Sequence, residues 1–273
     1  QSTYRATDTP ALMAESLKAR FDNDDQLRRD SLTRARDCAA LAKPWILPRE
    51  SRQPDKSLPE NYQSVGSRGA TTVEGKMLMA LYPPGVPWHQ SVLPPKLLHD
   101  PLVPDEQKQQ MLQVLLLRDL TITATLEQTQ LRTSGKQRRR TGFRSAKRMA
   151  LSQLLITGDV LERIDEHFRM ITFRRDQYVT KRDSAKDVLY HITREQIDPL
   201  TLTPKQWAAS NLAAELREKP VAERMQDLFT LVEWQPIGQN WVIRQEVNEN
   251  DINESSEQVS PYFTTAYELV AGD

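Results

Sequence analysis

A glycine-rich stretch with a lysine is the first place in this sequence where a chemical site could lie. Residues 69–77 read GATTVEGKM, which is similar to a phosphate-binding loop. Such a loop has Gly-x-x-x-x-Gly-Lys-Ser/Thr after a buried strand, so that backbone amides surround the phosphates and the hydroxyl binds magnesium. Here Gly75 follows Gly69 by six positions rather than five, Met77 replaces the hydroxyl, and the preceding LPENYQ is not a strand pattern. We therefore expect no nucleotide site.

Helix packing explains these glycines better. Small and apolar residues recur three or four positions apart between residues 65 and 81, which predicts a helix that Pro83 and Pro84 end. We expect Gly69 to lie close to a neighbouring element. The side chains expected to form the buried stripe are those of Val73, Met77 and Leu81.

None of the other reactive groups has the spacing of a catalytic or metal site. The four histidines, which lack partners at metal-ligand spacing, are His89, His99, His167 and His191. Cys38 lies in a helical pattern, and we expect a buried, inert thiol. Two acidic clusters, Asp24/Asp25 and NENDINE at residues 248–254, are expected to be solvated turns. The sequence predicts no metal, no cofactor and no enzyme.

The densest charge feature is the basic run GKQRRRTGFRSAKR at residues 135–148, which contains no acid. Such a run can neutralise DNA phosphates and make binding salt-dependent. A solvated face, or a contact with an acidic surface of a neighbouring chain, are the alternatives, and the equal totals of 37 basic and 37 acidic residues temper the DNA interpretation. We expect Phe143 and Met149 to be turned inward. The candidate contact residues are Lys136, Arg138, Arg139, Arg140, Arg144, Lys147 and Arg148.

Helical patterns come first along the chain and strand patterns second. Helical periodicity covers residues 10–43, 65–81, a long stretch from Asp105 and about 139–156, with a short strand expected at 88–93. From Asp159 the chain is rich in β-branched and aromatic residues, with a hairpin at Gly238-Gln239 and a short helix after Thr203. The order predicts an α+β fold. The best candidate for a membrane span, MLQVLLL from Met111, is too short to cross a membrane.

Five separated blocks of this sequence resemble the head-to-tail connector (portal) proteins of short-tailed phages. The blocks cover nearly the whole chain from about Leu32. They are LTRARDCAALAKPWILP, YQSVGSRGATTVEGKMLMALYPPGVPW, AKRMALSQLLITGDVLERI, FRRDQYVTKRDSAKDVLYHITREQI and PYFTTAYELVAGD. Two features depart from the family pattern: Asp159 stands where the family often has asparagine, and the basic run around Arg139 is denser.

The resemblance implies the portal-protein fold and a structural role. Residues 1–158 would be the helical part of the wing and 159–273 its β-rich part leading to the stem, with stem, clip and crown outside this chain and both ends continuing. It implies a virion protein, assembled in the host cytoplasm into a ring of usually twelve copies at one capsid vertex. Its partners would be the major capsid protein, tail proteins, terminase and double-stranded DNA. The alternative is a nucleic-acid-binding or nucleic-acid-processing protein that uses residues 136–148.

Overall fold

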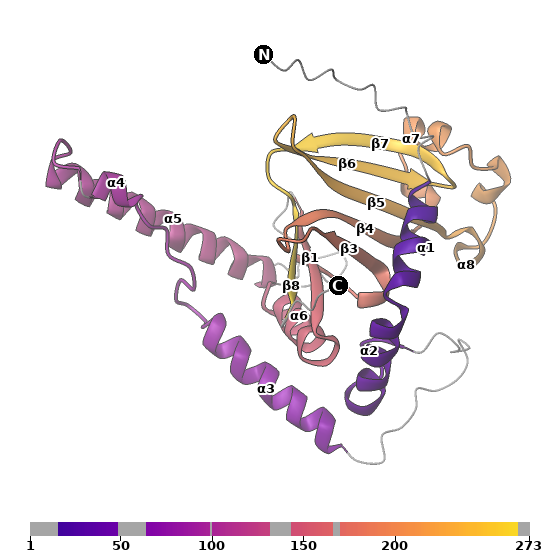
Figure 1. The fold of residues 1–273 in the computed structure, drawn as a ribbon, viewed down its shortest axis with the longest axis horizontal. Helices are drawn as coiled ribbons and strands as arrows, with labels where there is room; N and C mark the ends of the chain where they lie inside the picture. Colours follow the sequence, from indigo (N-terminus) through magenta and orange to yellow (C-terminus); the bar gives the residue numbers. More distant parts are fainter. Residues whose placement is uncertain (1–15, 49–63, 99, 132–142, 166–169, 267–273) are drawn as a thin grey trace. The chain divides into compact units, whose positions relative to one another are not determined.

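The computed structural model describes residues 16–48, 64–98, 100–131, 143–165 and 170–266 (Figure 1). It confirms the α+β class, with helices and two antiparallel sheets. The described residues form two compact units. One contains residues 16–34 and 175–260, and the other contains residues 35–174 and 261–266. The division of a wing between residues 158 and 159 stays a prediction.

The first unit is built on a five-stranded sheet with the order β3-β4-β5-β6-β7. Its strands are β3 Tyr178–Arg182, β4 Val188–Ile197, β5 Gln226–Gln235, β6 Asn240–Val247 and β7 Asn250–Glu257. The predicted hairpin joins β5 to β6, where Gln239 has a φ of 48°. Asn248 and Glu249 both have positive φ, which suits the tight turn between β6 and β7.

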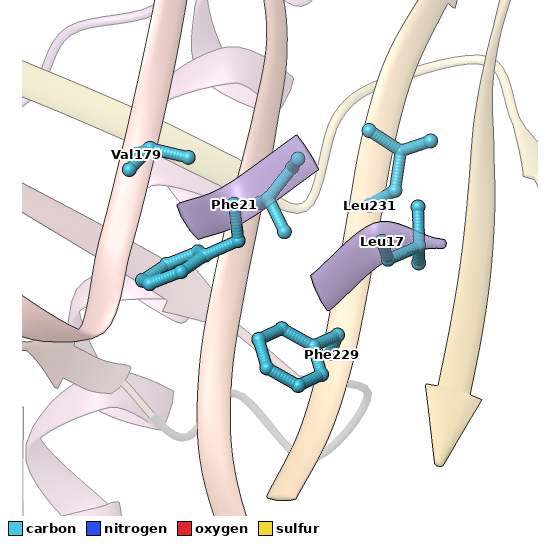
Figure 2. Close-up of a cluster of buried hydrophobic side chains, with 6 residues drawn as sticks. Leu17, Phe21, Val179, Phe229 and Leu231 are labelled. Atoms are coloured by element: carbon cyan, nitrogen blue, oxygen red, sulfur yellow. The ribbon is translucent and has the colours of Figure 1, made fainter. Parts of the chain in front are cut away.

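Helix α1 (Leu17–Leu27) packs across this sheet. Leu17 and Phe21 are buried against Val179, Phe229 and Leu231, as Figure 2 shows. The rings of Phe21 and Phe229 meet edge to face, with centroids 5.7 Å apart. Burial of Leu17 and Phe21 contributes about 1.5–3 kcal/mol each relative to full exposure.

A buried carboxylate fixes the start of α1. Glu246 on β6 accepts hydrogen bonds from the backbone N–H groups of Leu17, at 2.8 Å, and Lys18, at 3.4 Å. These are two of the amides that a helix N-terminus leaves without an intrahelical partner. Because the negative charge also lies at the positive end of the helix dipole, Glu246 both caps and orients α1.

Short helices connect β4 to β5 in the same unit. They are η2 Pro199–Thr201, α7 Pro204–Ala209, η3 Ala214–Arg217 and α8 Val221–Arg224, and η1 Arg175–Gln177 precedes β3. The predicted helix after Thr203 is α7, and Thr203 and Gln206 form a capping box at its start.

The second unit combines helices with a small sheet of order β2-β1-β8. The strands are β1 Asp159–Ile164, β2 Met170–Phe173 and β8 Tyr262–Ala266. The helices are α3 Val65–Leu81, α4 Pro95–Leu98, α5 Asp105–Leu131 and α6 Phe143–Thr157, together with residues 35–42 of α2 Arg29–Ala42. Gly158, with a φ of 81°, ends α6 as predicted. None of the described helices has the length and apolarity of a membrane span.

Four local expectations are wrong. Residues 88–93 do not form a strand, although Trp88 packs in an aromatic cluster. Cys38 is exposed on α2, because the buried stripe runs through Leu32, Ala35 and Ala39 and leaves position 38 beside it. Met149 is exposed, whereas Phe143 is buried as expected. The acidic clusters are not simply turns, because Asp24 and Asp25 lie inside α1 and residues 250–254 of NENDINE lie in β7.

Candidate interaction surface

Three of the seven candidate cations of the basic run lie in α6. Arg144, Lys147 and Arg148 are described, whereas Lys136, Arg138, Arg139 and Arg140 lie outside the described residues. Arg144 donates a hydrogen bond to the backbone oxygen of Tyr82 at 2.6 Å. It therefore ties the start of α6 to the residue that follows α3.

Lys147 points into its unit rather than towards solvent. It is 8% exposed, and its Nζ donates to Glu162 Oε2 on β1 at 2.8 Å. The rings of Tyr82, Phe143 and Phe263 surround the ammonium, with centroids 5.0–5.9 Å away. Burial raises the pKa of the Glu162 carboxyl, and the nearby Lys147 opposes this shift. Lys147 is buried with an intrachain partner, and Arg144 and Arg148 also have intrachain contacts, so the surface prediction rests chiefly on Lys136, Arg138, Arg139 and Arg140.

A second buried ion pair joins three helices. Glu74 on α3 is 1% exposed and accepts from Lys43 Nζ, at the end of α2. Lys43 also donates to Ser152 Oγ on α6 at 3.2 Å. Arg148, which is half exposed, places its Nε 3.6 Å from the other Glu74 oxygen. An ion pair therefore lies at the centre of the contact that α3 makes with α2 and α6.

This arrangement overturns the packing predicted for α3. Val73 and Leu81, expected to be buried, are 43% and 50% exposed, and Glu74 is the buried side chain of the helix. Among the described residues, a Cβ added to Gly69 would meet no atom within 4 Å, whereas one on Gly66 would lie 3.4 Å from the backbone oxygen of Leu41. The predicted helix is right, but it turns a polar side chain inward.

Helix α5 is anchored at one end and exposed along much of its length. Leu126 and Ile122 pack with Phe143 of α6. Asp119 is buried and accepts from the backbone N–H of Ser91 at 2.7 Å and from its hydroxyl at 2.6 Å. These hydrogen bonds hold the pKa of Asp119 below its usual value.

A serine, an aspartate and a histidine meet at this anchor, but not as a catalytic triad. His89 Nε2 lies 3.5 Å from Asp119 Oδ1, and the Ser91 hydroxyl donates to the same carboxylate. A nucleophilic serine needs the imidazole as its base, with the carboxylate behind it. Here the carboxylate binds the hydroxyl directly, so the serine is not activated.

Among the described residues, the other histidine and the acidic residues considered as site candidates make contacts that stabilise the fold. His191 is buried on β4 with Nδ1 2.9 Å from Thr180 Oγ1, while His99 and His167 lie outside the described residues. Asp24 accepts from the Tyr190 hydroxyl at 2.7 Å, and Asp251 pairs with Arg244 at 3.1 Å. In the part of the chain that the structure describes, no three His, Cys, Asp or Glu side chains are grouped to hold a metal ion.

Comparison with known proteins assigns the family. The model of the family described as "Bacteriophage head to tail connecting protein" matches residues 14–273. The chain belongs to this family, which confirms the predicted resemblance and the prediction of a structural protein rather than an enzyme. The chain is 26% identical over 195 residues to the portal protein of Escherichia phage T7, and 25% identical over 193 residues to that of Enterobacteria phage T3. Each match covers 67% of this chain and 32% of the relative, so the matched part spans about a third of those proteins.

Proposed function

We propose that this chain is the wing part of a portal subunit in a phage particle. The family match over residues 14–273 carries this proposal. The complete subunit would form a ring of about twelve copies at one capsid vertex, through a head-to-tail contact that closes on itself. DNA would pass through this ring during packaging and ejection, and a tail would attach to it. Residues 1–158 would form the helical part of the wing and residues 159–273 its β-rich part.

The described side chains suit a component that holds its shape. Buried pairs fix α3 and α6 in the second unit, and Glu246 fixes α1 in the first. The large aliphatic side chains left exposed on α5 provide contact area of the kind that subunit interfaces bury. Major capsid protein, tail proteins and terminase are the proposed partners. The proposed location is the virion, after assembly in the host cytoplasm.

Native mass measurement of the complete protein that carries this chain tests the proposal. A portal subunit should give one dominant oligomer, with a mass that is a fixed multiple of the subunit mass over a wide range of protein concentration. A protein that stays monomeric or dimeric at all concentrations would overturn the proposed function.

The basic run supports a second candidate function, direct binding of duplex DNA. The charge reversal Arg139→Glu/Arg140→Glu should lower the salt dependence of DNA binding by about two units of log–log slope if both side chains neutralise phosphates. Fluorescence anisotropy at several salt concentrations measures this slope. The control Arg118→Glu/Lys205→Glu changes the net charge equally at two exposed positions elsewhere.

The same variant separates the alternatives for the basic run. Intact rings with weakened DNA binding indicate a DNA contact, and a loss of rings indicates a contact between subunits. If both properties match those of the control variant, the run is a solvated surface and neither contact exists.

A further inference from the structure

The exposed face of α3 consists of small and apolar residues together with one cation, Lys76. With Glu74 turned inward, the exposed positions include Val65, Gly69, Val73 and Ala80, which recur at helical spacing. No atom of the described residues lies within 4 Å of a Cβ added at Gly69, so this part of the face is open in the described structure. We define the α3 face as Val65, Gly69, Thr72, Val73, Lys76 and Ala80.

The exposed side of α5 carries large aliphatic side chains. Leu112, Leu116 and Leu120 follow one another at four-residue spacing, and Leu117 lies beside them. Their exposed fractions run from 45% to 66%. These four residues form the α5 stripe. The segment between Lys108 and Arg118 contains no charged residue, so water covers an apolar surface there at a free-energy cost.

The two surfaces are complementary in size and in charge. Leucines that project from one helix can fit against a face of small residues on another, as ridges fit into grooves. The exposed acid Glu106 precedes the α5 stripe, next to Asp105, whose carboxylate lies 3.4 Å from Lys108 Nζ, whereas the α3 helix exposes the cations Arg68 and Lys76. Opposite charges at such a contact favour one partner and one register.

Among the residues that the structure describes, none covers the α3 face or the α5 stripe. The α3 face and the α5 stripe are exposed in the same structure, although α3 and α5 each pack against α6 (Figure 1). A contact between two different faces of identical chains is heterologous, and repetition of such a contact generates a ring when the rotation closes. Two different complementary faces on one subunit are what a head-to-tail contact requires.

We propose that the α5 stripe of one subunit packs on the α3 face of the next subunit. This inference rests on the proposed function, because it names the surfaces through which the ring would form. The partner of each α3 face is a second copy of the same chain. Every contact around the ring has the same head-to-tail direction.

Site-directed cross-linking tests this contact. Two single-cysteine subunits, Leu116→Cys and Val73→Cys, are prepared in a complete subunit freed of its other cysteines, including Cys38→Ser in this chain. One of the two is isotopically heavy, and they are mixed and assembled. A short bismaleimide should join position 116 of one subunit to position 73 of another, and mass spectrometry should find this pair as heavy–light peptides.

Matched controls lie on the same helices. Arg118 is two residues, or about 200°, from both Leu116 and Leu120, so Arg118→Cys is exposed on the other side of α5. Thr71→Cys is exposed on α3 but outside the α3 face. A mixture of these control subunits should give at least tenfold less cross-link than the 116–73 mixture.

The outcomes separate this inference from the proposed function. Electron microscopy of the same samples shows whether rings are present. Rings without a 116–73 cross-link above the controls overturn the inference, and so do dominant 116–116 or 73–73 products, which would mean isologous contacts. Absence of rings overturns the proposed function, and the inference falls with it.

Discussion

Lys43 and Glu74 form a buried ion pair that joins the end of α2 to the middle of α3. The hydroxyl of Ser152 on α6 accepts from the same ammonium, so one charged group connects three helices. Because α3 turns Glu74 into its unit, the opposite side of the helix, which carries Val65, Gly69 and Val73, remains exposed. The buried Lys43–Glu74 pair thus determines which side chains of α3 form the surface of the proposed wing.

Removal of one partner of this pair should be costly. Glu74→Gln leaves Lys43 buried without a countercharge, and we expect the free energy of unfolding to fall by about 3–5 kcal/mol. Urea denaturation followed by circular dichroism measures this change. The exposed neighbour variant Lys76→Gln should change stability by less than about 0.5 kcal/mol. Equal effects of the two substitutions would contradict the buried pair.

Lys147 and Arg148 should respond differently to substitution although they are adjacent in the basic run. Lys147→Met leaves Glu162 buried without its cation, so we expect a loss of about 3–5 kcal/mol of unfolding free energy. Arg148→Met, at a half-exposed position 3.6 Å from Glu74, should cost about 1 kcal/mol or less. Thermal and urea unfolding of both variants measure the difference. A surface role for Lys147 would give two small, equal losses.

Gly69 and Gly66 should tolerate larger side chains to different degrees. Gly69→Ala meets open space in a helix interior, so the chain should gain up to about 1 kcal/mol of stability. Gly69→Phe should leave the subunit folded but prevent ring formation, because it fills the α3 face. Gly66→Phe should be tolerated less well by the fold than Gly69→Phe, since a Cβ at Gly66 would already touch the Leu41 oxygen at 3.4 Å. Circular dichroism and native mass measurement separate the two effects, and intact rings of Gly69→Phe would contradict the role of this face.

His191 should make stability depend on pH. Burial, together with Arg182, lowers the pKa of His191 to about 4. In the unfolded chain, with a pKa near 6.5, the imidazole takes up its proton first, so acid favours unfolding. The stabilisation is complete above pH 6.5 and is lost as pH falls towards 4, by about 3 kcal/mol in total.

The variant His191→Gln isolates this contribution. Urea unfolding at intervals from pH 4 to pH 8 should show a smaller decline of stability on acidification in the variant than in the parent chain. Parallel curves for the two proteins would contradict a buried neutral histidine.

The parts of the fold that local chemistry determines could be predicted from the sequence. Thr203 with Pro204 starts α7, Gly158 ends α6, and the turn at Gly238-Gln239 joins β5 to β6. Each of these signals acts within a few residues, through a cap, a positive φ or a tight turn. Helix α3 was predicted over the same residues for the same reason, because its pattern and its terminating prolines are local.

The side chains that face inward could not be predicted in the same way. Glu74 is buried because Lys43, 31 residues earlier, lies opposite it, and Lys147 is buried because Glu162 does. Helical periodicity identifies faces, but the partner of each face depends on tertiary packing. An apolar stripe is expected to turn inward in a solitary globular chain, and the α3 face does not. The sequence offered one sign of this inward-facing side chain: Glu74 is an acid in the middle of a helix of mostly small residues.

Electron microscopy of the complete protein tests the central claim most directly. If the chain is the wing of a portal subunit, end-on views should show closed rings of one copy number around a central channel, with this region at the periphery. Single subunits, isologous dimers or open filaments under all assembly conditions would contradict the account.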